Sequence, residues 1–277
     1  MSRILVVDDD KTTRLVLRKV LTNAGFSTAV AKDGVEALKA IDAGGFDLLL
    51  LDVWMPRMNG LELLAKLRSA KNRPRVVVMT SDDAPETLLK AVREQAFKYV
   101  HKPVESAALL ETVQDALAAP EGPPIEVVSA RPEWVELLVP CTREAAGRIE
   151  SVMAHLDANL APDVRESIAF AFRELLLNAV EWGGKLDPSR TVRIACLRAR
   201  RMLIYRIADP GPGFDIEELP HAAIGHPPGD PIAHMHVREA KGIRPGGFGL
   251  LTVRASVDEL LHNEQRNEVV FIKYLDA

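Results

Sequence analysis

The stretch Leu48–Pro56, LLLLDVWMP, decides the fold of the first part of this 277-residue chain. A run of four leucines is typical of a strand that is buried on both faces, as the strands of a parallel sheet are. The run ends in an acid, Asp52, and the segment Ile4–Asp10, ILVVDDD, repeats this pattern close to the N-terminus. Acids at the ends of buried strands predict a site that handles phosphate.

Short apolar runs alternate with amphipathic helical stretches five times between residues 2 and 117. Five strand–helix repeats predict a doubly wound α/β domain with a five-stranded parallel sheet that is covered on both faces. Such sheets bind ligands at the carboxyl ends of their strands. The polar residues that fall at those ends are Asp8, Asp9, Asp52, Thr80 and Lys102.

The pattern changes beyond a proline-rich stretch, AAPEGPPIEVVSARPEW, at residues 118–134. We therefore expect a first domain over residues 1–119, a linker over 120–133 and a second domain over 134–277. The second domain should contain helices near 142–159, 162–181 and 247–260, with consecutive strands between and after them. This order predicts an α+β sandwich in which helices cover one face of a mixed or antiparallel sheet. Residues 216–247 are rich in Pro, Gly and His, which indicates a long active-site lid.

The composition argues against several classes of protein. A formal net charge of −4, a pI near 6.0 and the lack of an Arg/Lys-rich segment argue against direct DNA binding. We find no N-terminal leader and no apolar run close to the roughly 20 residues that span a bilayer, so we expect a cytoplasmic protein without a membrane anchor. Cys141 and Cys196 lie far apart in apolar segments, which predicts reduced, buried thiols without a function.

The polar residues of the first domain suit phosphoryl transfer to a carboxylate. Magnesium prefers oxygen ligands, so an aspartate that accepts a phosphoryl group needs other carboxylates close by, and Asp8 and Asp9 supply them. Asp52 would attack phosphorus as the nucleophile. Thr80 and Lys102 would neutralise and hydrogen-bond the phosphoryl oxygens.

These residues belong to motifs that resemble the receiver domain of bacterial response regulators, over about the first 118 residues. The motifs are DDD at 8–10, DVWMPRMNG at 52–60, MTS at 79–81 and HKP at 101–103. The resemblance implies a flavodoxin-like fold, a cis peptide before Pro103 and a magnesium ligand in the backbone carbonyl of Trp54. It also implies a switch role for Tyr99, which would swing inward with Thr80 on phosphorylation. It also implies a sensor histidine kinase as the phosphodonor.

The second domain contains a different set of polar residues, which suits a nucleotide. In RELLLNAVEWGG at 173–184, Glu174 and Asn178 lie one helical turn apart, so both side chains project from the same face. Asn178 can ligate magnesium and Glu174 can act as the general base for an attacking hydroxyl.

Two glycine-containing motifs follow along the chain. In DPGPGF at 209–214, Asp209 can accept a hydrogen bond from adenine, while Gly211 and Gly213 let the backbone approach the base. In RPGGFGL at 244–250, backbone amides and a helix N-terminus would face the phosphates of ATP, through Gly246, Gly247 and Gly249.

The order and spacing of these three motifs resemble the N, G1 and G2 boxes of the GHKL ATPase superfamily, over about residues 125–277. Within it the chain is most similar to the anti-sigma-factor serine/threonine kinases of partner-switching systems, through ELLLNAVEWG, SVDEL and NEVVFIK. That resemblance implies a serine or threonine on a STAS-domain antagonist as the substrate, and a sigma factor as a possible further partner.

The chain departs from that family at two places. Trp182 stands where the family usually has histidine, and it would pack against the linker or the sheet rather than touch nucleotide. The lid is longer and richer in proline than in the family, so the residue that contacts phosphate stays open between Lys241 and Arg244, and either can instead be a solvated loop charge.

Structural roles are favoured over functional ones for the histidines of the second domain. His221, His226, His234 and His236 crowd the lid, where a polar lid is favoured over a metal site because zinc ligands need fixed elements. His155 precedes the ATPase motifs, but VMAHLDANL lacks the residues of a histidine-kinase H box, so a surface or capping histidine is favoured over a phosphoacceptor.

Three functions stay open from the sequence. The leading hypothesis is a response regulator in which phosphorylation of Asp52 controls an ATP-dependent serine/threonine kinase. The second is a binding module in which nucleotide stabilises a surface that sequesters a sigma factor or an antagonist. The third is an ATPase that phosphorylates itself on His155, as in a hybrid histidine kinase. The sign of control and the formation of a homodimer stay open under each hypothesis.

Overall fold

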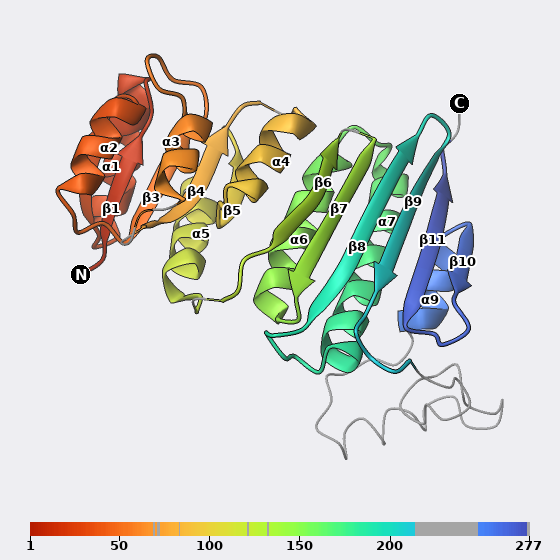
Figure 1. The fold of residues 1–277 in the computed structure, drawn as a ribbon. Coiled ribbons are helices and arrows are strands. Elements are labelled where there is room, and N and C mark those ends of the chain that lie inside the picture. Colours follow the sequence, from red (N-terminus) through yellow and green to blue (C-terminus); the bar gives the residue numbers. More distant parts are fainter. Residues whose placement is uncertain are drawn as a thin grey trace. The chain divides into compact units, whose positions relative to one another are not determined.

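The computed structural model describes residues 1–68, 70, 73–82, 84–120, 122–131, 133–213 and 249–275. The chain forms two compact units, Met1–Gly122 and Pro123–Ala277 (Figure 1).

The first unit is a parallel α/β sheet domain, which confirms the predicted flavodoxin-like fold. Its five strands lie in the order β2-β1-β3-β4-β5, and all the pairs are parallel. This order belongs to the doubly wound folds that bind ligands where strands end. Its elements are β1 (Arg3–Val7), α1 (Lys11–Asn23), β2 (Ser27–Ala31), α2 (Gly34–Asp42), β3 (Leu48–Asp52), α3 (Gly60–Leu67), β4 (Arg75–Thr80), α4 (Pro85–Arg93), β5 (Lys98–His101) and α5 (Ser106–Ala118).

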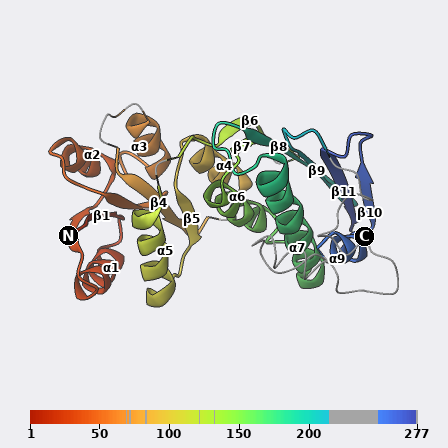
Figure 2. The same cartoon turned by 90° about the horizontal axis from the view of Figure 1, so that it is seen from below.

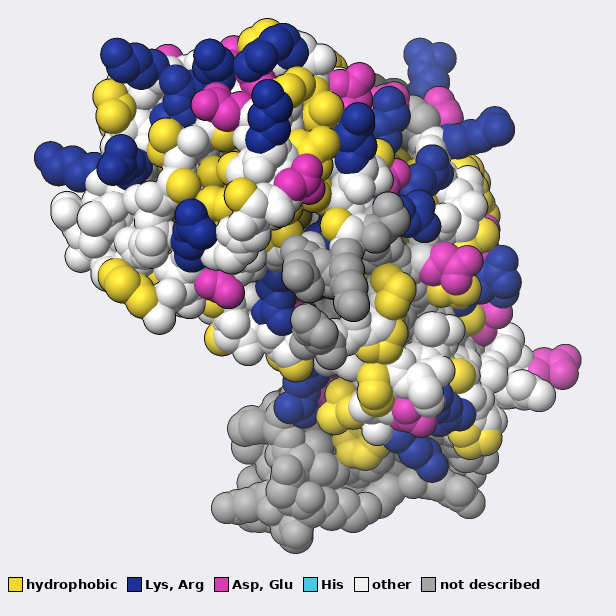
Figure 3. Space-filling model, turned by 60° about the vertical axis from the view of Figure 1, so that its left-hand side comes forward, with side chains coloured by type: hydrophobic (Ala, Val, Ile, Leu, Met, Phe, Trp, Pro, Cys, Tyr) yellow, Lys and Arg dark blue, Asp and Glu magenta, His cyan; other side chains and the backbone are white. Residues whose placement is uncertain are grey.

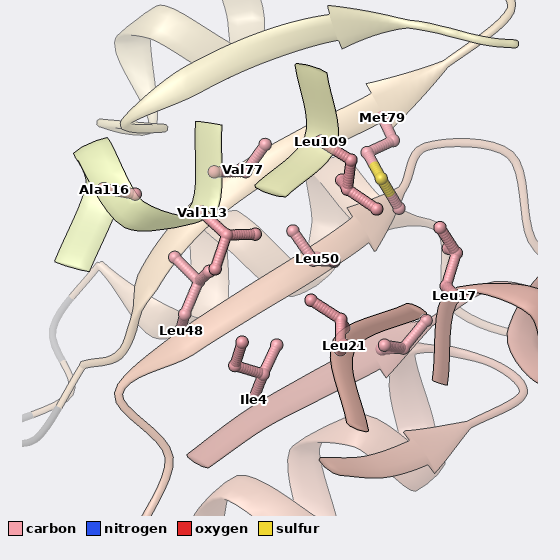
Figure 4. Close-up of a cluster of buried hydrophobic side chains, with 11 residues drawn as sticks. Ile4, Leu17, Leu21, Leu48, Leu50, Val77, Met79, Leu109, Val113 and Ala116 are labelled. Carbon is pink, nitrogen blue, oxygen red and sulfur yellow. The ribbon is translucent and has the colours of Figure 1, made fainter. Parts of the chain in front are cut away.

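The sheet of the first unit is covered on both faces. Alternate residues of β1, β3 and β4 pack against α1 and α5 in one core cluster (Figure 4). The other face carries α2 and α3, which contact each other, and α3 also contacts α4 (Figure 2). All four leucines of β3 are fully buried, as side chains that point alternately into two cores must be. The leucine run therefore requires the two-sided sheet that the sequence predicts.

The second unit is an antiparallel sheet with helices on one face, which confirms the predicted α+β class. Its six strands lie in the order β10-β11-β9-β8-β7-β6, and every pair is antiparallel. Figure 1 shows the helices together on one side of this sheet. The elements are β6 (Glu126–Arg131), β7 (Trp134–Pro140), α6 (Arg143–Leu156), α7 (Pro162–Asn178), η1 (Ala179–Gly183), β8 (Thr191–Ala199), β9 (Met202–Ala208), α9 (Gly249–Ser256), β10 (Glu259–His262) and β11 (Glu268–Tyr274).

Two stretches differ from the sequence expectation. Residues 120–133 were expected to form a linker, but they contain β6, which pairs with β7. The helix expected over 247–260 is found as α9 and ends at Ser256, and Glu259 and Leu260 begin β10 instead. The helix ends early because the following residues pair with β11, with Glu259 opposite Ile272 and Leu260 opposite Phe271. A long-range strand partner overrides the local helical pattern there.

The helix that carries Glu174 and Asn178 ends in a wider turn. It is an α-helix up to Asn178, and residues Ala179–Gly183 form a π-helical turn. The backbone N–H of Gly184 donates to the carbonyl of Ala179 at 2.8 Å, a bond across five residues rather than four. Such turns are rare and occur mostly as single turns near functional sites.

A buried polar cluster joins α6 to the sheet of the second unit. Asp157, which follows α6, is 3% exposed and accepts from Arg198 of β8 at 2.6 Å and from the hydroxyl of Tyr205 of β9 at 2.5 Å. The ring of Tyr205 stacks on Phe271 of β11, with ring centroids 4.8 Å apart. Burial raises the pKa of Asp157, while the Tyr205 hydroxyl and the Arg198 charge oppose that rise.

Replacing Asp157 with alanine is expected to destabilise the second unit by about 2–4 kcal/mol, because the buried Tyr205 hydroxyl and the Arg198 guanidinium lose the carboxylate to which both donate. Arg198 still donates to the carbonyl of Leu156. Urea unfolding measured by tryptophan fluorescence will check this, since Trp134 and Trp182 lie in this unit. Glu166→Ala, which removes an exposed acid from α7, should change the free energy of unfolding by less than about 0.5 kcal/mol. An equal effect of the two substitutions would contradict the role of the cluster.

Candidate functional site

Three carboxylates meet at the carboxyl edge of the parallel sheet. Asp8 and Asp9 follow β1, Asp52 ends the neighbouring β3, and one carboxylate oxygen from each lies within 4.8 Å of the others. Asp8 and Asp52 are buried, whereas Asp9 is exposed. An all-oxygen set with one side open to solvent fits a hard cation that keeps water ligands, such as Mg²⁺.

Lys102 joins two of these carboxylates. Its Nζ lies 2.6 Å from Oδ2 of Asp8 and 3.0 Å from Oδ1 of Asp52, and the peptide between Lys102 and Pro103 is cis, as the resemblance implies. Burial raises the pKa of Asp52, although the nearby ammonium of Lys102 opposes this. For Lys102, burial works to lower the pKa, but the hydrogen bond to Asp8 and the charge of Asp52 outweigh it and raise the pKa. The lysine therefore remains charged beside the candidate phosphoacceptor.

Thr80 and Tyr99 lie on the two strands beyond Asp52. Thr80 ends β4, is fully buried, and its hydroxyl oxygen accepts the backbone N–H of Asp82 at 3.2 Å. Tyr99 is a buried residue of β5, and its hydroxyl donates to the backbone carbonyl of Asp82. The two predicted switch residues thus contact the same residue in the loop after β4.

The loop after Asp52 is held close by a glycine. A Cβ at Gly60 would overlap the backbone carbonyl of Asp52, and the N–H of Gly60 donates to the carbonyl of Val53 at 2.8 Å. Asn59 caps α3 in a reciprocal arrangement with Glu62. Trp54, whose backbone carbonyl is the remaining predicted metal ligand, lies in this loop with 58% of its surface exposed.

Glu174 and Asn178 lie on α7 as predicted, one turn apart, and Gly249 begins a neighbouring helix, α9, that contacts α7. A Cβ at Gly249 would lie 2.5 Å from Oε2 of Glu174, so the N-terminus of α9 approaches that carboxylate closely. A second acid, Glu150 of α6, has its pKa raised by burial and by the charge of Glu174, against the opposing charge of Arg173. The structure therefore brings Glu174 and Gly249 together.

Asp209 is enclosed by two glycines. Its Oδ1 accepts the N–H of Gly211 at 2.7 Å, and a Cβ at Gly183, the last residue of the π-helical turn, would overlap its carboxylate. Burial raises the pKa of Asp209, although the Gly211 N–H and the charge of Arg190 oppose this. Gly213 has φ +85°, and a Cβ there would overlap the carbonyl of Gln265. Glycine is thus required at Gly183 and Gly213, because the neighbouring protein atoms leave no room for a Cβ.

Residues that were not assigned a role from the sequence hold this loop. Arg190 donates to the carbonyl of Gly183 at 3.2 Å and to that of Pro210 at 2.8 Å. Asn267 donates from Nδ2 to the carbonyl of Gly211 at 3.1 Å and accepts the N–H of Asp209 through its own backbone. Gly183 belongs to the predicted motif RELLLNAVEWGG, whereas no local sequence pattern indicates the role of Arg190.

Two family models match the chain. The response regulator receiver domain matches residues 4–114, and the histidine kinase-like ATPase domain matches residues 139–273. The chain joins a receiver domain to a histidine-kinase-like ATPase domain. The carboxylate cluster of Asp8, Asp9 and Asp52 lies in the receiver domain, and Glu174 and Asp209 lie in the ATPase domain.

Curated relatives and solved structures are each similar to part of this chain. Response regulator MprA of Mycobacterium avium is 38% identical over 143 residues, 51% of this chain and 62% of the relative. MprA of Mycobacterium leprae is 37% identical over 145 residues, 52% of this chain and 63% of the relative. The chain thus spans less than two thirds of these relatives. Chemotaxis protein CheY4 of Vibrio cholerae is 30% identical, with 42% of this chain and 99% of that chain covered and a TM-score of 0.41. Response regulator TrrA of Thermotoga maritima is 34% identical, with 42% and 100% covered and a TM-score of 0.39.

Several predicted residues of the ATPase domain lie outside the described residues. They are Gly246, Gly247, Lys241, Arg244 and the four lid histidines, His221, His226, His234 and His236. Trp182 is described: it lies on the π-helical turn with 41% of its surface exposed.

His155 and the two cysteines of the ATPase domain have contacts or burial typical of structural residues. His155 Nδ1 lies 2.8 Å from the carbonyl of Ser151, one turn earlier on α6. Cys141 and Cys196 are free and buried, as predicted, and burial raises the pKa of their thiols to about 11 and about 12. These thiols are therefore unreactive at neutral pH.

The described residues contain no helix that is both long and apolar enough to cross a membrane. On the face drawn in Figure 3, Lys and Arg side chains are intermixed with Asp and Glu.

Gly183→Ala is expected to lower the affinity of the ATPase domain for ATP at least tenfold, because the added methyl group would displace the Asp209 carboxylate. Gly147→Ala is the matched control, since a Cβ at this position of α6 meets nothing within 4 Å and should favour the helix. Titration with a fluorescent ATP analogue measures both variants. Equal affinities would contradict a nucleotide contact at Asp209.

Proposed function

We propose that the chain is a two-component response regulator in which phosphorylation of Asp52 controls an ATP-dependent protein serine/threonine kinase. One juxtaposition supports the kinase: a carboxylate, Glu174, lies one helical turn from Asn178 and directly beside the start of α9 at Gly249. A module that only binds nucleotide has no need of a base at that position.

In the receiver domain, Asp52 is the proposed phosphoacceptor. An oxygen of its carboxylate forms a bond to the phosphorus of a sensor kinase's phosphohistidine, the P–N bond breaks, and the released imidazole takes up a proton. Lys102 moves its positive charge from two carboxylates to the phosphoryl oxygens, and the Thr80 hydroxyl donates to one of them. Asp8, Asp9, Asp52 and the carbonyl of Trp54 would hold Mg²⁺, which neutralises charge as it builds up on the transferred group.

In the ATPase domain, the proposed reaction is transfer of the terminal phosphoryl group of ATP to a hydroxyl. Asp209 would bind the adenine amino group, and Gly211 and Gly213 would let the backbone approach the base. Asn178 would ligate Mg²⁺ through its amide oxygen. Glu174 accepts the proton of the attacking serine or threonine hydroxyl as the new P–O bond forms and the bond to ADP breaks. Gly249, at the start of α9, would contribute a backbone amide to the phosphates, and the sequence predicts the same role for Gly246 and Gly247.

The proposed protein substrate is a STAS-domain antagonist of an anti-sigma factor, with a sigma factor as a further partner. The support is the resemblance of ELLLNAVEWG, SVDEL and NEVVFIK to the kinases of partner-switching systems. Mixing the full chain with Mg-ATP and a STAS-domain protein from the same genome should give acid-stable phosphoserine or phosphothreonine on that protein. No transfer from the wild type, with or without acetyl phosphate to load the receiver, would contradict the kinase.

The second candidate is a nucleotide-dependent binding module that sequesters a sigma factor or the antagonist. It predicts capture of the partner in ATP without transfer of phosphate. Phosphorylation of His155 is the third candidate, and it predicts acid-labile phosphate on the Asp52→Ala protein. The position of His155 against the carbonyl of Ser151 gives that candidate no support.

A further inference from the structure

Asp82, in the loop between β4 and α4 of the receiver domain, accepts three hydrogen bonds through its carboxylate. Oδ2 accepts the indole N–H of Trp54 at 3.0 Å and the hydroxyl of Thr87 at 2.6 Å. Oδ1 accepts the backbone N–H of Ala84 at 2.9 Å. The carboxylate thereby ties the loop that follows Asp52 to the first turn of α4.

The backbone of the same residue contacts both predicted switch residues. The N–H of Asp82 donates to the Thr80 hydroxyl oxygen, and the carbonyl of Asp82 accepts from the Tyr99 hydroxyl. Because the Thr80 oxygen already accepts one hydrogen bond, its own proton is directed away from Asp82 and can be donated elsewhere. A fixed Asp82 therefore restricts the directions in which Thr80 can donate.

The three hydrogen bonds that Asp82 accepts suit an ionised carboxylate better than the neutral amide of asparagine. The Thr87 hydrogen bond lowers the pKa of Asp82 despite partial burial, and the Ala84 N–H and the Trp54 indole lower it further. An ionised carboxylate has acceptor sites for all three donors. In asparagine one oxygen becomes an NH₂ group, which would face either Ala84 or the pair Trp54 and Thr87 as a second donor.

We propose that Asp82 is a positioning residue for phosphorylation of Asp52. Through Trp54 and Thr80 it holds the two loops that border the phosphoacceptor, one from β3 and one from β4. The proposal rests on the proposed role of Asp52 and assigns to Asp82 and the Trp54 indole a part in that reaction. Loss of either group is expected to slow phosphorylation about fivefold, the effect of one lost hydrogen bond on a positioned group.

The contact itself is testable without any reaction. Labelling the full chain with ¹⁵N-tryptophan gives three indole resonances, one for each tryptophan, and Trp54→Phe identifies that of Trp54. Exchange of this indole proton with solvent is expected to become at least threefold faster in Asp82→Ala. Glu86→Ala, which removes an exposed acid from the first turn of α4, should leave it unchanged. Equal exchange in Asp82→Ala and wild type would overturn the proposal.

The functional test is a double-mutant cycle on the initial rate of phosphorylation by acetyl phosphate and Mg²⁺. Asp82→Ala and Trp54→Phe, which keeps the backbone carbonyl, should each be about fivefold slower than wild type, while Glu86→Ala stays within about twofold. The double variant should be no slower than Asp82→Ala, because both substitutions remove the same bond. If the single variants stayed within twofold of the wild-type phosphorylation rate, the role of Asp82 would be overturned. The same holds if the losses of the two single variants multiplied in the double variant. Neither result would affect the role of Asp52. No phosphorylation of wild type would overturn the role of Asp52 as well.

Discussion

Asp52→Asn is expected to abolish phosphorylation of the receiver domain by acetyl phosphate or by a sensor kinase, with a loss of at least about 100-fold. The amide keeps the shape of the side chain but lacks the nucleophilic oxygen and removes one anion from the set around Asp8. Incorporation of phosphate into the full chain, resolved on a phosphate-affinity gel, measures the loss directly.

Two controls make the Asp52 result specific. Asp47→Asn changes an exposed acid before β3, at the opposite end of that strand, and should be phosphorylated like wild type. Addition of excess EDTA to wild type should stop incorporation, because the carboxylate set would then lose its cation. Undiminished incorporation in Asp52→Asn would place the phosphoacceptor elsewhere and refute the assignment.

Glu174→Gln is expected to lower phosphoryl transfer to the protein substrate by about 100-fold or more, since a positioned general base contributes about 10²–10⁴ to the rate. Binding of ATP and capture of the partner should persist, because the amide has nearly the same shape beside Gly249. Transfer is measured with radiolabelled ATP, and capture by pull-down with the partner in the presence of ATP.

Glu166→Gln is the matched control for that experiment, since it alters an exposed acid two turns earlier on the same helix. Its transfer rate should equal that of wild type. If Glu174→Gln transferred phosphate at the wild-type rate, Glu174 would not be the base. If wild type captured the partner without any transfer, the binding module would be the correct function.

The candidate site of the receiver domain could be predicted from the sequence because its residues lie at equivalent points of adjacent strands. Asp8, Asp52 and Thr80 each lie at or directly after the carboxyl end of a strand, and β1, β3 and β4 are neighbours in the sheet. A short continuous apolar run with polar residues at its end carries that information locally. The Trp54–Asp82 contact spans 28 residues between two irregular loops, where no periodic pattern exists.

The ATPase domain shows the same division between local and long-range information. Glu174 and Asn178 follow from helical spacing alone, whereas Arg190 acts through two backbone carbonyls, which leave no mark on the side-chain pattern. The strand β6 was missed because its neighbours are prolines and because it pairs with β7 through a register shift between Val127 and Ser129. Local propensity could not indicate such a partner.

The π-helical turn at Ala179–Gly183 has a consequence for insertions and deletions in this part of the chain. An α-helix rotates by roughly 100° per residue, so loss of one residue from this turn would restore regular winding and turn everything after it by that angle. Asn178 would keep its direction, but Gly183 would no longer face Asp209. Length, as well as residue type, is therefore constrained between the two halves of the proposed nucleotide site.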